Sequence, residues 1–89
     1  MMDREKKIAR NGKTFAALAD VDCEISRARS KFPDNKHLFA ALVEEVVELA
    51  KELLEKGNTA HARYEAMQVA CVAIRIMTEG DSDFKGGES

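Results

Sequence analysis

Three glutamates lie within five residues in the middle of the chain, as Glu44, Glu45 and Glu48. Residues three or four apart share one face of a helix, so these carboxylates would stand close together on a helical segment. In projection Glu45 falls at the edge of an apolar face, near Leu38 and Leu49. This position predicts a half-buried carboxylate, which needs a partner, and a metal ion is one such partner.

A second polar stripe follows on the next predicted helix, where Glu65 and Gln68 lie one turn apart. If the two helices run antiparallel, this stripe turns toward Glu45 and Glu48, and four oxygen-bearing side chains converge. Oxygen ligands on rigid helices suit Mg²⁺, with Mn²⁺ as an alternative, because these ions keep several waters and bind substrate phosphates. The sequence therefore predicts metal ligands at Glu45, Glu48, Glu65 and Gln68.

The same acidic cluster is also typical of a solvated helix face. Glu44 and Glu48 are like charges one turn apart, a pairing that costs a few tenths of a kcal/mol and that no lysine four residues away offsets. That cost favours a functional interpretation, but the pattern by itself leaves both interpretations open.

Apolar residues recur at three- and four-residue spacing over three segments, residues 14–32, 36–57 and 59–79. Pro33 ends the first predicted helix, and Asp34 or Asn35 is placed to cap the second. Gly57 and Gly80 have the position of residues just past a helix end. The short connection after Gly57 predicts that the second and third helices are antiparallel neighbours.

The third predicted helix has a narrow polar stripe, and the rest of its circumference is almost wholly apolar or small. The stripe consists of His61, Glu65, Gln68, Arg75 and Glu79. A chain of three helices cannot cover so much apolar surface, so we expect a homo-dimer or homo-tetramer.

The chain has 89 residues, 14 basic and 16 acidic, with a formal net charge of -2 and 6% aromatic residues without Trp. This composition predicts one domain, residues 1–80, followed by a polar tail at 81–89 that we expect to be disordered. It gives no reason to expect a nucleic-acid or membrane partner. Cys23 and Cys71 are isolated, and the N-terminus is charged rather than apolar, so we expect reduced thiols and a cytoplasmic location.

At the glutamates the chain resembles the MazG-like, all-α nucleoside triphosphate pyrophosphohydrolases, in particular small phage and bacterial members. Their signature E-E-x-x-E, followed on the next helix by E-x-x-D, corresponds to Glu44-Glu45-Val46-Val47-Glu48 and Glu65-Ala66-Met67-Gln68. The resemblance covers residues 31–76. It implies an N-terminal helix plus a helical hairpin, assembled into an oligomeric MazG-like four-helix-type bundle. It also implies Mg²⁺-dependent hydrolysis of a nucleoside or deoxynucleoside triphosphate to the monophosphate and pyrophosphate, as a deoxynucleotide-pool enzyme.

On this resemblance the catalytic residues are Glu44, Glu45 and Glu48. Glu45, Glu48 and Glu65 are expected as metal ligands, and Glu44 as a ligand or as the base that orients the attacking water. Gln68 stands where the family has aspartate. Its carbonyl oxygen can coordinate a metal but brings no charge, so it is a second-rank ligand.

Three further residues are candidates for binding substrate. Lys51 and Arg75 extend the two polar stripes and are placed to hold phosphate oxygens, although solvated helix charges would give the same pattern. Asp20 of the first helix is expected, from the family, to line the base pocket. The competing interpretation of the whole chain is a non-catalytic helical oligomerisation or interaction protein with a degenerate metal site, in which Gln68 marks lost chemistry.

Overall fold

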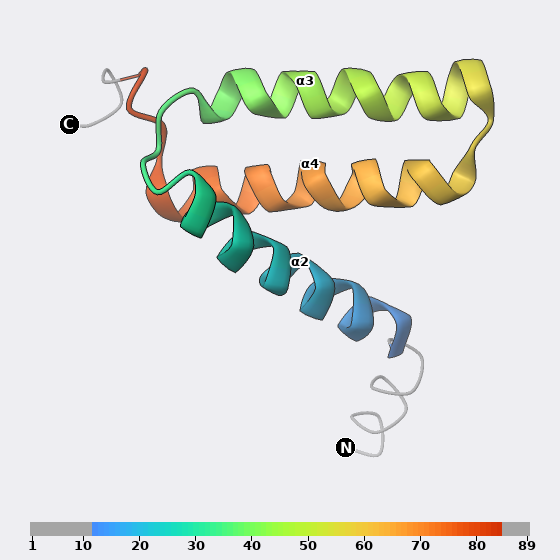
Figure 1. Ribbon diagram of the computed structural model, residues 1–89, viewed down its shortest axis with the longest axis horizontal. Helices are drawn as coiled ribbons and strands as arrows, with labels where there is room; N and C mark the ends of the chain where they lie inside the picture. Colours follow the sequence, from blue (N-terminus) through green and yellow to red (C-terminus); the bar gives the residue numbers. More distant parts are fainter. Residues whose placement is uncertain (1–11, 85–89) are drawn as a thin grey trace, which may run out of the picture.

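The computed structural model describes residues 12–84, which form an all-helical protein (Figure 1). The elements in chain order are α2 (Gly12–Lys31), α3 (Leu38–Ala50), the π-helix η1 (Lys51–Lys56) and α4 (Thr59–Glu79). Because η1 continues α3 directly, the two form the long central helix expected from the sequence. The all-α class and three main helices are confirmed for this part of the chain. Residues 1–11 lie outside the described residues.

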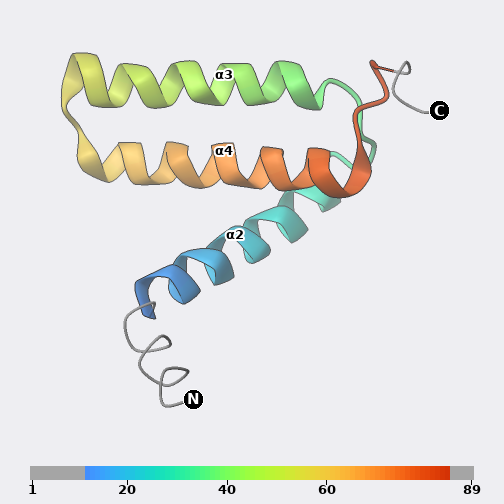
Figure 2. The ribbon, with the colours of Figure 1, turned by 180° about the vertical axis from the view of Figure 1, so that it is seen from behind.

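Helix α4 is the central element, since both α2 and α3 pack against it. α3 and α4 run antiparallel side by side, whereas α2 crosses α4 and diverges from it toward the N-terminus, as both views show (Figures 1 and 2). The buried apolar residues of the described chain are few: Val21, Ile25, Leu38, Ala62 and Cys71. So small a core leaves much apolar surface uncovered.

Large apolar side chains are exposed on α2 and along the central helix. On α2 they are Phe15 and Leu18. On α3 and η1 they belong to the face that the periodicity predicts to be apolar, namely Phe39, Val43, Val46, Val47, Leu53 and Leu54. Among residues 12–84, no helix combines the length and apolar character needed to cross a membrane.

The hairpin between the central helix and α4 follows the predicted local signals. Gly57 adopts a left-handed conformation, with φ of 62°, which favours glycine. Asn58 caps α4, because its side-chain oxygen accepts a hydrogen bond from the His61 backbone N–H at 3.1 Å. Glu52, at the start of η1, is 6% exposed. It lies seven residues after Glu45, a spacing that places both side chains on the same face of the helix.

The turn between α2 and α3 is held by a buried side chain of α4. Arg75 is 3% exposed, and one of its terminal nitrogens donates to the backbone carbonyls of Phe32 and Asp34, at 3.0 and 3.1 Å. Its Nε and the same terminal nitrogen donate to the Glu79 carboxylate, at 2.9 and 2.8 Å. Arg75 therefore fixes the ends of all three helices relative to one another.

The first residues of the predicted tail contact the start of α3 rather than extending away from it. Asp81 Oδ2 accepts a hydrogen bond from the Phe39 backbone N–H at 2.7 Å. His37 occupies the N-cap position in a left-handed conformation, with φ of 61°, and makes no capping hydrogen bond through its side chain. Asp81 thus supplies the cap from a distant part of the sequence, and neither of the residues predicted for that role does so. Residues 81–84 thus lie against the start of α3, and residues 85–89 of the predicted tail lie outside the described residues.

Candidate functional site

Glu45 of α3 and Glu65 of α4 meet across the antiparallel hairpin. Both side chains are partly buried, and the Glu65 carboxyl group lies close enough to that of Glu45 to affect its pKa. Burial raises the pKa of Glu45 to about 7, and the hydrogen bond to Glu65 and the charges of Glu65, Glu44 and Glu48 act in the same direction. The carboxyl group of Glu45 therefore holds its proton up to a pH near 7. The predicted half-burial of Glu45 is confirmed.

The other two glutamates of the central helix do not enter this contact. Glu44 and Glu48 are both exposed, and a Glu48 oxygen lies 4.0 Å from the Lys51 ammonium nitrogen. Within residues 12–84, no three side chains of Asp, Glu, His or Cys gather closely enough to hold a metal ion by themselves. The described chain therefore offers a carboxylate pair where the sequence predicted a larger cluster.

Gln68, one turn beyond Glu65, turns its amide toward α2. Its Nε2 donates to Glu24 Oε2 at 2.8 Å. Arg27 donates to the same carboxylate from Nε, at 3.0 Å, and from a terminal nitrogen, at 2.5 Å. These two donors lower the pKa of Glu24, Arg27 more than Gln68. Sequence reasoning missed Glu24 because an acid three residues before an arginine is typical of a surface helix pair.

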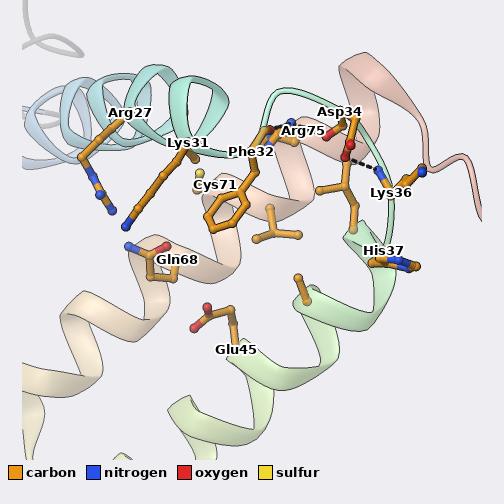
Figure 3. A pocket seen from close by; sticks show the side chains of 14 residues that line it. Arg27, Lys31, Phe32, Asp34, Lys36, His37, Glu45, Gln68, Cys71 and Arg75 are labelled. Carbon is orange, nitrogen blue, oxygen red and sulfur yellow. Dashed lines mark hydrogen bonds between the residues drawn. The ribbon is translucent and has the colours of Figure 1, made fainter.

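A cavity of about 440 Å³ lies beside the carboxylate pair, between α2, α4 and the first half of α3. Glu45 and Gln68 border it, and the basic side chains of Arg27, Lys31 and Lys36 line the side formed by α2 and the following turn. In Figure 3, Arg27 and Lys31 extend from α2 toward Gln68, and Glu45 points into the same space from α3. Basic side chains and the Glu45 carboxylate thus line the same cavity.

The three predicted substrate-binding residues lie in different places. Arg75 borders the cavity, where it is buried and its hydrogen bonds tie helix ends together, and its role in holding phosphate stays a prediction. Lys51 is exposed beside Glu48, on the outer side of the central helix. Asp20 borders a separate hollow between α2 and α4, together with Tyr64.

A second acidic group lies at the hairpin end of the molecule. Glu52 Oε1 is buried without a hydrogen-bond partner, and the nearest basic atom is His61 Nδ1, at 3.7 Å. Lys56 contacts the other oxygen of this carboxylate at 3.2 Å. Glu52 is thus held by ion pairs at the hairpin end and takes no part in the cavity that Glu45 borders.

The chemistry of the carboxylate pair fits a divalent cation. Two carboxyl groups that meet in a partly buried place must share a proton or bind a cation, because two like charges cannot both ionise there cheaply. Mg²⁺ commonly takes only one or two protein carboxylates and fills its remaining positions with water and substrate phosphate. Glu45 and Glu65 would hold such an ion at the edge of the cavity, and Gln68 borders the same space.

Comparison of the chain with protein-family models, curated proteins and solved structures finds no match.

Proposed function

We propose that this protein is a magnesium-dependent nucleoside triphosphate pyrophosphohydrolase of the MazG-like type, with Mn²⁺ able to replace Mg²⁺. Its reaction would convert a nucleoside or deoxynucleoside triphosphate to the monophosphate and pyrophosphate. The observation that carries the proposal is the Glu45–Glu65 carboxylate pair beside a cavity whose opposite side is cationic. The E-E-x-x-E signature at Glu44, Glu45 and Glu48 supports it, and so does the contact of the two helices that bear the signature.

The proposal gives the residues of the cavity distinct roles. When bound, the divalent ion neutralises the phosphate charge and activates the attacking water. Glu45 and Glu65 hold the ion, which requires Glu45 to give up the proton that it otherwise keeps. Arg27, Lys31 and Lys36 bind phosphate oxygens and orient the triphosphate along the cavity.

Glu44 and Glu48 enter the proposal through their charge. Both raise the pKa of Glu45, so both strengthen the negative potential that attracts a cation to it. Glu48 lies one helical turn from Glu45 on the same helix, and it remains the next carboxylate that an ion at the pair would meet. A direct ligand role for Glu48 predicts that its neutralisation weakens the metal site more than neutralisation of Glu44.

We further propose that the protein works as a homo-dimer or homo-tetramer. The support is the apolar surface that α2 and the central helix leave exposed, from Phe15 and Leu18 to Val46 and Leu54. Large exposed apolar side chains in such number are typical of interaction sites on proteins. Size-exclusion chromatography with light scattering tests this proposal, and a monomer at micromolar concentration would contradict it.

The alternative is a non-catalytic helical interaction protein. The exposed apolar surface favours it. The two functions predict different effects of a divalent metal ion on the Tm of the protein. The enzyme should be stabilised by millimolar Mg²⁺ through Glu45 and Glu65, whereas the interaction protein should show no metal-linked change in Tm.

Pyrophosphate release tests the proposed reaction. Purified protein is incubated with each of the common ribo- and deoxyribonucleoside triphosphates, in Mg²⁺, in Mn²⁺ and with a chelator. We expect metal-dependent release of pyrophosphate that is lost in Glu65→Gln and retained in an exposed control, Arg63→Gln. Release that persists in Glu65→Gln would place the activity elsewhere. No release from any triphosphate would favour the interaction protein.

A further inference from the structure

The carboxylate of Glu24 links two residues of the cavity that come from different helices. It accepts a hydrogen bond from Gln68 Nε2 on α4, at 2.8 Å, and two from Arg27 on its own helix. Both donors line the cavity that Glu45 borders. Glu24 therefore contacts two of the side chains that line the cavity.

The burial of this carboxylate separates it from an ordinary surface ion pair. The Glu24 side chain is 11% exposed, whereas that of Arg27 is 57% exposed. An exposed pair of this spacing contributes little, but a carboxylate this little exposed needs its donors. The hydrogen bond from Gln68 is thus part of what makes burial of Glu24 favourable, and it joins α2 to α4 close to the carboxylate pair.

The same hydrogen bond fixes which way the Gln68 amide points. A carboxylate accepts and does not donate when ionised, so it selects the NH₂ end of the amide and leaves the carbonyl oxygen as the end not bound to Glu24. Hydrogen bonds to an ionised acceptor are about twice as strong as neutral ones, so this orientation is well held. A glutamine held in this way can offer an oxygen to a cation, whereas a freely rotating amide would offer its nitrogen equally often.

We infer that Glu24 is a positioning residue of the proposed metal centre. It orients Gln68 so that the carbonyl oxygen is available to a cation at Glu45 and Glu65, and it holds Arg27 at the mouth of the cavity. The inference rests on the proposed function. It accounts for the glutamine as a neutral ligand that a carboxylate on another helix keeps in one orientation.

The test is a titration with MnCl₂, followed by the electron paramagnetic resonance signal of free Mn²⁺. The variants are Glu24→Ala, which removes the acceptor, and Glu24→Gln, which loses the charge but keeps an oxygen that can accept from Gln68. Asp22→Asn is the matched control, because it removes one charge from an exposed residue of the same helix. Alanine is the residue that helices favour most, so Glu24→Ala should remain folded, and circular dichroism checks this.

We expect Glu24→Ala to raise the Kd for Mn²⁺ about 10-fold, as loss of a residue that orients a metal ligand commonly does. Glu24→Gln and Asp22→Asn should stay within about 3-fold of the wild-type protein, since each keeps an acceptor beside Gln68. Gln68→Met preserves volume and removes the amide, so it should weaken binding to the same degree. Adding Glu24→Ala to Gln68→Met should change nothing further, because the two residues act as one unit.

Three outcomes would overturn the inference while leaving the metal centre in place. The first is equal weakening by Glu24→Ala, Glu24→Gln and Asp22→Asn, which would assign the effect to charge alone. The second is additive weakening by Glu24→Ala and Gln68→Met. The third is wild-type binding that Glu24→Ala leaves unchanged. If the wild-type protein binds no Mn²⁺, the proposed metal centre fails, and the inference fails with it.

Discussion

Substitution of Glu45 by glutamine should make the protein more stable at alkaline pH when no divalent metal is present. The pKa of Glu45 is raised from 4.5 to about 7 by burial and by the neighbouring carboxylates, Glu65 first. A carboxyl group with a raised pKa in the folded state contributes stability below pH 4.5 that is lost progressively as the pH rises to about 7. Glutamine mimics the protonated carboxyl group, since its NH₂ can donate to Glu65 at any pH.

The magnitude follows from the difference between the two pKa values. A rise from 4.5 to about 7 corresponds, at about 1.36 kcal/mol for each pH unit, to about 3 kcal/mol. Glu45 is only partly buried, and water screens part of this cost, so we expect Glu45→Gln to gain about 2 kcal/mol at pH 8. For a domain of this size that is a rise in Tm of about 10 °C. At pH 4 the variant and the wild-type protein should be nearly equal.

Urea denaturation from pH 4 to pH 9 in the presence of a chelator measures this difference. Glu44→Gln is the matched control, because Glu44 is the adjacent residue, carries the same charge and is exposed. The control should show a much smaller change with pH. If the stabilities of Glu45→Gln and the wild-type protein run parallel from pH 4 to pH 9, the pKa of Glu45 is not raised in the folded protein, and the reasoning is refuted.

Three further substitutions test other contacts. Arg75→Met should lower the free energy of unfolding by about 3 kcal/mol, because it leaves two backbone carbonyls without their donor and removes two hydrogen bonds to the Glu79 carboxylate, which keeps one from Arg29; an effect below about 1 kcal/mol in urea denaturation would contradict its structural role. Asp81→Ala should cost about 1 kcal/mol through loss of the cap on α3, whereas Ser82→Ala should cost nothing measurable by the same method. Gln68→Asp places a second carboxylate against Glu24, so it should lower Tm in chelator and increase the rise in Tm that Mn²⁺ produces; a lower Tm in both conditions would exclude a cation near residue 68.

The helices and their connections could be predicted because their signals are local. Apolar spacing fixed three helical segments, and Gly57 and Asn58 marked the hairpin by backbone conformation and capping chemistry. The partial burial of Glu45 followed from its place at the edge of the apolar face of the central helix. The contact between Glu45 and Glu65 follows from the antiparallel hairpin, which a short connection imposes.

The features that the sequence did not reveal depend on contacts between distant residues. Asp81 caps a helix that begins more than forty residues earlier, so no local pattern indicates it. Glu52 is buried at the hairpin end, where Lys56 and also His61 of α4 lie against its carboxylate. Arg75 belongs to the polar stripe of α4, as the sequence predicted. At the position of Arg75, however, this stripe faces the turn between α2 and α3. Glu24 gains its importance from Gln68, which belongs to another helix.

The most direct test of the metal centre is calorimetric titration with MgCl₂ at pH 6.5, in two buffers that differ in their enthalpy of ionisation. At this pH Glu45 still carries most of its proton, given a pKa of about 7, and a cation bound between Glu45 and Glu65 must displace it. We predict that the wild-type protein releases about three quarters of a proton for each Mg²⁺ bound, and that Glu45→Gln releases none. Magnesium binding with a heat that is the same in both buffers, or no binding at all, would contradict a metal centre at this pair of carboxylates.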